Sequence, residues 1–176
     1  MITIAVRDRL GGVKAAGREW EPEELVGAWT LLDGDWDLVG NKSGATRLGF
    51  GLLLKFFELE GRFPRHAGEV PKAAADYVAG QVKVDPGLFA EYRWSGSTIE
   101  YHRAQVRQAL GFREATRADE DVLAEWLAEK ICPMVFTDEG LRAEVLGQCR
   151  RLRIEPPGRV ERIVGRGSSG SSARRC

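Results

Sequence analysis

Apolar residues recur at helical spacing along most of the chain, and convincing alternation of period two is confined to residues 1–6. The strongest pattern runs from Ala45 to Leu59, where apolar side chains occupy nearly every side and Leu48, Leu52 and Phe56 share one stripe. A helix that is apolar almost all round is normally buried. We therefore expect residues 45–59 to form the central helix of the fold.

Start and stop signals place further helices on both sides of this one. Prolines at first-turn positions, an Asp85-Pro86 pair, a capping box between Thr116 and Asp119, and Gly111 as a terminator mark the boundaries. Four predicted helices cover residues 23–32, 35–40, 45–59 and 98–110. Four more are predicted to begin near Pro71, Pro86, Thr116 and Thr137. A short last helix is predicted at residues 159–164. The helix after Thr116 is expected to bury Val122, Trp126, Leu127 and Ile131.

These elements predict an all-α fold class, with about six to eight helices in a compact bundle. Residues 1–20 are expected to be poorly ordered. Residues 21–115 are expected to form a first helical region and residues 116–165 a second helical region. Residues 166–176, which are rich in Ser, Gly and Arg, have the composition of a disordered C-terminal tail.

The charge of the chain excludes a simple electrostatic argument for a polyanionic partner. The sequence contains 26 basic and 26 acidic residues, so its formal net charge is zero. The distribution is uneven, because residues 41–115 carry 11 basic and 8 acidic side chains and residues 137–176 carry 9 and 5. Any attraction to nucleic acid must therefore be local.

Cysteine usage and hydropathy indicate a cytoplasmic protein. The three cysteines, Cys132, Cys149 and Cys176, form no CxxC pair, and only two histidines accompany them. This is poor material for a zinc site or for disulfides, so we expect no metal, and Cys132 and Cys149 are interpreted as small core residues. No apolar run approaches the roughly 20 residues that span a bilayer, and residues 1–6 are too short for a signal peptide.

The predicted helix at 98–110 has two distinct faces when residues are placed 100° apart. Ile99, His102 and Val106 lie on one side with Ala109 and Leu110, which predicts that this side meets the core. The opposite side and its flank carry the candidate DNA contacts Ser97, Tyr101, Arg103, Gln105, Arg107 and Gln108. Amides can pair with adenine edges while arginines reach phosphate or guanine. The alternative is an ordinary solvated face that contacts nothing.

Three other features have both a functional and a structural interpretation. His102 is interpreted as a partly buried, hydrogen-bonded histidine and not as a base or metal ligand. Lys42 and Arg47 precede or open the central helix, where backbone amides attract phosphate, although they can equally be solvated cations. An arginine-rich stretch from Arg150 to Arg166 could follow a DNA backbone or simply form a hydrophilic end.

Several of these segments resemble the N-terminal domain of Tn-three family (class II, replicative) transposases. The most specific parts are TRLGF at Thr46–Phe50, the FxxxGRFP sequence ending at Pro64, and RQALGFRE ending at Glu114. The similarity extends over about residues 23–164. It implies a helical region that binds the terminal inverted repeats of a transposon with two small helical DNA-binding modules, residues 21–115 forming the first DNA-binding region. Under this DNA-binding hypothesis, Arg113 is a further candidate phosphate contact beside the residues named above.

The same resemblance implies that this chain is not an enzyme by itself. The family's catalysis uses a metal-binding acidic triad in a ribonuclease-H-like domain far downstream, so we assign no catalytic residue, metal or cofactor here. The expected partners are double-stranded DNA at transposon ends and transposase subunits, with no membrane and no small-molecule substrate. The alternatives are a helical fragment that associates with or interferes with full-length transposase, and a non-functional gene remnant.

Overall fold

A computed structural model describes residues 19–131, 134 and 137–173, with side chains described as far as Ser169. The described chain is mostly helical, which confirms the predicted fold class. It divides into two compact units, one ending at Leu110 and the other beginning at Gly111. The expectations for residues 1–18, Cys132 and Cys176 lie outside the described residues.

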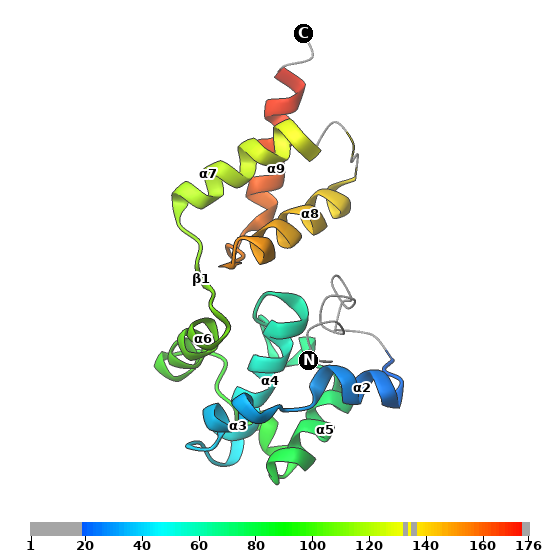
Figure 1. Ribbon diagram of the computed structural model, residues 1–176, viewed down its shortest axis with the longest axis vertical. Helices are drawn as coiled ribbons and strands as arrows, with labels where there is room; N and C mark the ends of the chain where they lie inside the picture. The colour runs from blue at the N-terminus through cyan, green and yellow to red at the C-terminus, as the bar shows by residue number, and fades with distance from the viewer. Residues whose placement is uncertain (1–18, 132–133, 135–136, 174–176) are drawn as a thin grey trace. The chain divides into compact units, whose positions relative to one another are not determined.

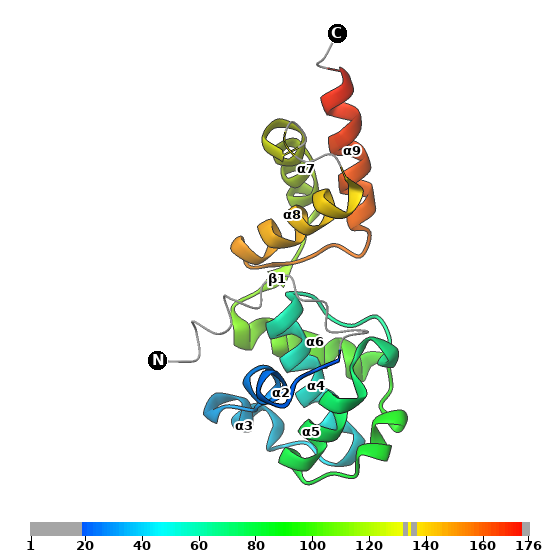
Figure 2. The ribbon, with the colours of Figure 1, turned by 90° about the vertical axis from the view of Figure 1, so that its right-hand side faces the viewer.

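The first unit is organised around the predicted central helix, α4 (Gly44–Glu60). Figures 1 and 2 show the other helices of this unit arranged around it, and α4 contacts every one of its longer neighbours. The chain leaves α4 at Gly61, whose φ of 69° is left-handed and therefore suits glycine. The other elements are α2 (Pro22–Trp29), α3 (Asp33–Val39), η1 (Ala67–Glu69), α5 (Lys72–Val82), η2 (Pro86–Glu91) and α6 (Ser97–Leu110).

Burial of α4 includes a charged side chain. Lys55 is 2% exposed, and its Nζ lies 3.0 Å from Asp35 Oδ2 and 2.6 Å from Glu58 Oε2. Asp35 Oδ2 also accepts a hydrogen bond of 2.8 Å from the backbone N–H of Leu32, which fixes the start of α3. Because a buried cation must be paired to be tolerated, this cluster ties α3 to α4.

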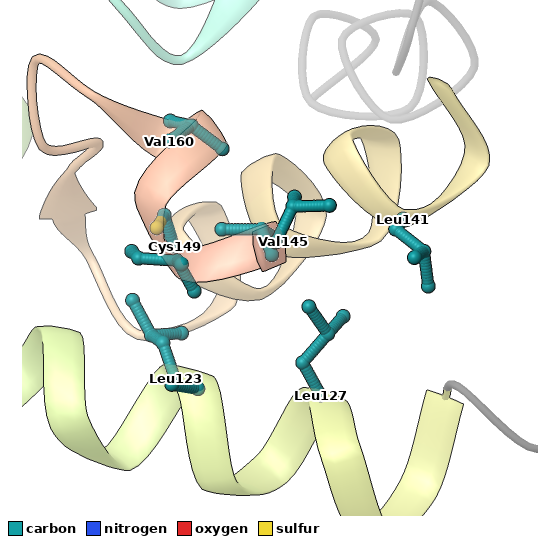
Figure 3. Packing of buried hydrophobic residues seen from close by; sticks show 9 residues of the cluster. Leu123, Leu127, Leu141, Val145, Cys149 and Val160 are labelled. Atoms are coloured by element: carbon teal, nitrogen blue, oxygen red, sulfur yellow. The ribbon is translucent and has the colours of Figure 1, made fainter. Parts of the chain in front are cut away.

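The second unit consists of three helices and a minimal sheet. Strands β1 (Arg113–Glu114) and β2 (Ile154–Glu155) pair in parallel, with Arg113 opposite Ile154. Figure 3 shows the aliphatic core, in which Leu123, Leu127, Leu141, Val145 and Cys149 meet. Cys149 is fully buried, as predicted, and burial raises the pKa of its thiol to about 11. The helical elements are α7 (Arg117–Trp126), the π-helical turn η3 (Leu127–Ile131), α8 (Asp138–Arg151) and α9 (Val160–Ala173).

The predicted disordered tail is wrong for residues 166–173, which continue α9. Val160, Ile163, Val164 and Gly167 recur at helical spacing and are all buried. A Cβ on Gly167 would lie 2.9 Å from Leu127 Cδ2, so the glycine allows the close packing of α9 on this leucine. Composition alone concealed this pattern. Residues 174–176 lie outside the described residues.

The predicted burial of Val122 is also wrong, because this side chain is 59% exposed. Leu123 and Ala124 of α7 are buried in its place, and the predicted burial of Leu127, the first residue of η3, is confirmed. Trp126 and Ile131 are only partly buried at the edge of the core. The predicted capping box is confirmed: Thr116 Oγ1 accepts from the Asp119 backbone N–H and Asp119 Oδ2 accepts from that of Thr116.

Candidate nucleic-acid interface

Helix α6 packs on α4, and three of the residues expected on its core side are buried, whereas the predicted burial of Ala109 is wrong and Leu110 is only half-buried. Ile99, His102 and Val106 are buried, with exposed fractions of 3% or less. Gly96, with a φ of 91°, precedes the helix, and Gly111, with a φ of 69°, follows it. Both backbone conformations suit glycine, and the left-handed residue after the last turn is a common helix terminator. Because this side of α6 is buried, only the residues on its other sides are accessible to an external partner.

His102 is hydrogen-bonded within the core, as expected. Its Nδ1 shares a hydrogen bond of 2.8 Å with the hydroxyl of Tyr92, and the two rings are nearly parallel, with an interplanar angle of 10°. Phe50 packs edge-on against the same imidazole at a centroid distance of 5.2 Å. Burial and the nearby positive charge of Lys42 lower the pKa of His102 to about 4, and burial raises that of Tyr92. Both groups are therefore neutral near pH 7.

Two of the predicted base-reading residues, Tyr101 and Gln108, point outward on α6, as does the candidate DNA contact Ser97. Ser97, Tyr101 and Gln108 are all exposed, and Tyr101 retains 63% of its accessible surface. Ala104 and Ala109 are exposed beside them and add no bulk. The outer side of α6 is thus a shallow polar surface with one prominent aromatic ring.

Gln105 differs from the other predicted base-reading residues because it is half-buried. Its Oε1 is enclosed and has no hydrogen-bond partner among the described residues. Burying an amide oxygen without a partner typically costs about 1–3 kcal/mol. The side chain therefore lies at the border between the buried side and the outer face, and not opposite the core as its position on the helix suggested.

The two arginines on the flank of α6 are partly buried. Arg103 Nη1 donates to Glu100 Oε1 over 3.1 Å, and the guanidinium lies 5.6 Å from the centre of the Phe63 ring. Its Nε is enclosed without a hydrogen-bond partner in the described part of the chain. Arg107, one turn later, is also half-buried. Both charges border the exposed face, but Arg103 is held by neighbours in the same unit.

Lys42 and Arg47 interact with the segment that precedes α4. The Lys42 ammonium donates to Leu38 O at 2.8 Å and Asn41 Oδ1 at 3.0 Å, lies 4.0 Å from the centre of the Phe50 ring, and is 9% exposed. Burial lowers its pKa. Arg47 donates from Nε to Lys42 O at 2.6 Å and from Nη2 to Gly40 O at 3.3 Å. The structure therefore does not bring Lys42 to the exposed face of α6.

Arg113 belongs to the second unit and forms a two-pronged ion pair there. Its Nη1 and Nη2 lie 2.6 Å and 2.8 Å from the two carboxylate oxygens of Asp119. This guanidinium, together with Thr116, holds the pKa of the Asp119 carboxyl well below its usual range. The Arg113 side chain is still 55% exposed, so one face of it stays accessible. The Thr116–Asp119 capping signal was visible in the sequence, but its arginine partner was not.

The arginine-rich stretch of the second unit is largely solvent-exposed. Arg151, Arg153, Arg159, Arg162 and Arg166 all have exposed side chains. Arg166 pairs with Asp121 at 2.6 Å, and Arg142 of α8 pairs with Glu161 of α9. Acidic residues thus compensate part of this stretch.

The described residues contain no group of three or more His, Cys, Asp or Glu side chains that could hold a metal ion. Among these same residues, the helices are all too short or too polar to pass through a bilayer. The expectations of no catalytic residue and no cofactor stay predictions.

Comparison with known proteins places the chain in a family. Residues 3–166 match DUF4158, a domain of unknown function, and the chain belongs to this family. It is also similar to the transposase for transposon Tn501 of Pseudomonas aeruginosa, with 29% identity over 136 residues. The similar region covers 74% of this chain but only 14% of the transposase, so the chain corresponds to a small part of that relative.

Proposed function

We propose that this chain binds duplex DNA at the terminal inverted repeats of a transposon, as the N-terminal part of a Tn-three family transposase. The observation that carries the proposal is the orientation of α6. Its Ile99, His102 and Val106 side is buried, so that Ser97, Tyr101 and Gln108 point outward. Similarity to a transposase over most of the chain supports it independently.

The outer side chains of α6 have the chemistry needed to read bases. The Gln108 amide can donate and accept at once, which matches the N6 and N7 edge of adenine. Tyr101 and Ser97 add hydroxyls for base or phosphate contacts. In the proposed complex Gln105 turns outward, and because its Oε1 has no partner in the described residues, this turn breaks no hydrogen bond at that atom.

Phosphate contacts are assigned to the arginines that border accessible surface, namely Arg103, Arg107 and Arg113. Arg47 is a weaker candidate because its guanidinium caps the backbone before α4. Lys42 is left out of the proposed contact set, since its ammonium is shared between two internal acceptors and an aromatic ring. Whether the second unit forms a second DNA-binding region is part of the same proposal and rests on its exposed arginines.

In this proposal the chain has no transposition activity of its own. It spans 14% of the similar transposase, and the chemistry of strand transfer is assigned to regions outside it. The chain supplies recognition, and the partner is double-stranded DNA together with transposase subunits.

The proposal is tested by selection from a library of random-sequence duplexes, followed by binding measurements on the selected duplex and a scrambled duplex. We expect one motif to be enriched and to bind at least about tenfold more tightly than its scrambled version. Three phosphate contacts predict a salt slope of about −2.7, equivalent to roughly a 40-fold loss of affinity between about 50 and 200 mM salt. Enrichment of no motif, or binding indifferent to salt, would contradict the proposal.

A protein-interaction role is the second candidate, favoured by exposed apolar side chains in the second unit. Val122 is 59% exposed and Met134 is 68% exposed. Exposed apolar side chains mark a protein contact where they belong to one contiguous patch, which is what this second role requires of them. This role predicts that the chain co-purifies with a longer transposase and that a Val122→Glu variant does not, whereas DNA selection yields no motif.

A further inference from the structure

Besides its apolar packing, α6 makes one directional contact with the rest of its unit, between His102 and Tyr92. Ile99 and Val106 bury the helix, but contacts between aliphatic side chains are non-directional and tolerate rotation about the helix axis. A rotation of about 20° would move atoms at the helix surface by roughly 2 Å, given a radius of about 5–6 Å. Hydrogen bonds to base edges do not survive displacements of that size.

The hydrogen bond between Tyr92 and His102 restrains the rotation of α6 about its axis. The 2.8 Å hydrogen bond between Tyr92 Oη and His102 Nδ1 joins α6 to the residue that follows η2, and the near-parallel rings add a second restraint. Tyr92 is 5% exposed and His102 3%, so water does not compete for either atom. A hydrogen bond in such a site has both a preferred distance and a preferred angle.

Tyr92 is itself fixed by α4. A Cβ built on Gly49 would lie 2.1 Å from Tyr92 Cδ2 and 2.4 Å from its Cγ, so the ring rests directly on the α4 backbone. The ring of Trp94 packs edge-on against the Tyr92 ring, with a distance of 5.4 Å between the ring centroids. With Gly49 below it and Trp94 beside it, the tyrosine has little freedom to follow a rotating α6.

We propose that Gly49, Tyr92 and His102 form a latch that sets the rotation of α6 and thereby positions Ser97, Tyr101 and Gln108 for base reading. In this arrangement Tyr92 and His102 are positioning residues that need not touch DNA. The latch rests on the proposed function, because its purpose is to align the outer face of α6. It acts on sequence discrimination and not on general attraction to phosphate.

The test compares two variants that make the same chemical change in the same unit. Tyr92→Phe removes the hydroxyl of the latch, whereas Tyr77→Phe removes the hydroxyl that shares a 2.8 Å hydrogen bond with Thr30 Oγ1. Affinity is measured for the selected and scrambled duplexes across a salt series. We expect Tyr92→Phe to lose about fivefold in discrimination, the equivalent of one net hydrogen bond, with its salt slope unchanged, and Tyr77→Phe to keep the wild-type ratio.

A second measurement does not depend on DNA. Hydrogen exchange of residues 97–110 in the free protein should accelerate in Tyr92→Phe and stay at the wild-type rate in Tyr77→Phe. The latch is overturned if Tyr92→Phe keeps wild-type discrimination, or if both variants lose it equally. If the wild-type protein discriminates between no duplexes, the proposed function fails, while faster exchange in Tyr92→Phe alone would still establish the contact.

Discussion

The two units of the chain are stabilised in different ways. The unit that ends at Leu110 encloses aromatic rings and a buried charge around a helix with almost no exposed side, and Phe50, Phe56 and Lys55 are all buried there. The unit that begins at Gly111 has an aliphatic core with one thiol. The ion pairs Arg113–Asp119, Arg142–Glu161 and Arg166–Asp121 of this unit are at the surface.

This difference explains why the candidate interface lies on α6 and not on α4. A helix that is buried all round can only support its neighbours, so the conspicuous TRLGF segment holds the fold together. Helix α6 is buried on one side, and in the proposed latch its reading of DNA depends on how that side is held. Buried polar groups thus determine geometry in the first unit, whereas surface polar groups add modest stability in the second.

The largest expected effect is the removal of the buried cation. Lys55→Met leaves Asp35 and Glu58 without their shared partner, and breaking a buried ion pair in this way costs about 3–5 kcal/mol. Hydrogen exchange should show the loss in the first unit only. Lys72→Met is the matched control, because Lys72 pairs with Asp76 in solvent and should change stability by less than about 1 kcal/mol. Equal losses of stability in the two variants would contradict the difference between the buried and the exposed ion pair.

The next effect comes from the contact between α4 and Tyr92. Gly49→Ala inserts a methyl group where the Tyr92 ring lies, so we expect a loss of about 1–3 kcal/mol from overpacking. Gly80→Ala, on α5, has no atom within 4 Å of the added Cβ and should stabilise the same unit by about 0.5–1 kcal/mol. Denaturant unfolding of both variants measures the difference, and effects of the same sign would argue against the described packing.

The pH dependence of stability reports on His102. Its pKa falls from 6.5 to about 4 on folding, so the unfolded state binds more protons between these values. The contribution of the neutral imidazole is fully present above about pH 6.5 and is lost as the pH falls toward 4. Between pH 7 and 5 the wild type should lose roughly 2 kcal/mol more than His102→Gln. Parallel stability curves for the two proteins would show that His102 is not buried as neutral imidazole.

The smallest effect is expected at the surface of the second unit. Thr116→Ala removes the N-cap of α7, which should cost about 1 kcal/mol. Hydrogen exchange should accelerate at the start of α7 while α4 is unaffected. A change that spreads to the first unit would contradict the separation of the two cores.

Sequence patterns predicted the features of this fold that depend on neighbours along one helix. The apolar run of α4, the spacing of Ile99, His102 and Val106, and the Thr116–Asp119 capping box all lie within single helical segments. Periodicity and capping chemistry are local, so the sequence is enough to reveal them.

Features that depend on the approach of distant segments were not predictable in the same way. Lys55 finds Asp35 twenty residues earlier, and Gly49 matters only because Tyr92 lies on it. Lys42 is predicted from sequence as a surface cation, yet it is buried and its ammonium lies over the Phe50 ring. The Ser- and Gly-rich composition of residues 166–173 predicted disorder. The segment is helical because it continues α9, which is held on the core by the helical spacing of Val160, Ile163, Val164 and Gly167.

The most direct test of the central claim, that the outer face of α6 reads DNA, is the affinity of Gln108→Ala for the selected and scrambled duplexes. Gln108 is exposed, so its truncation should leave folding intact. The account predicts a loss of about 1–3 kcal/mol of binding free energy on the selected duplex and none on the scrambled duplex. Unchanged affinity for the selected duplex, or an equal loss on both, would contradict it.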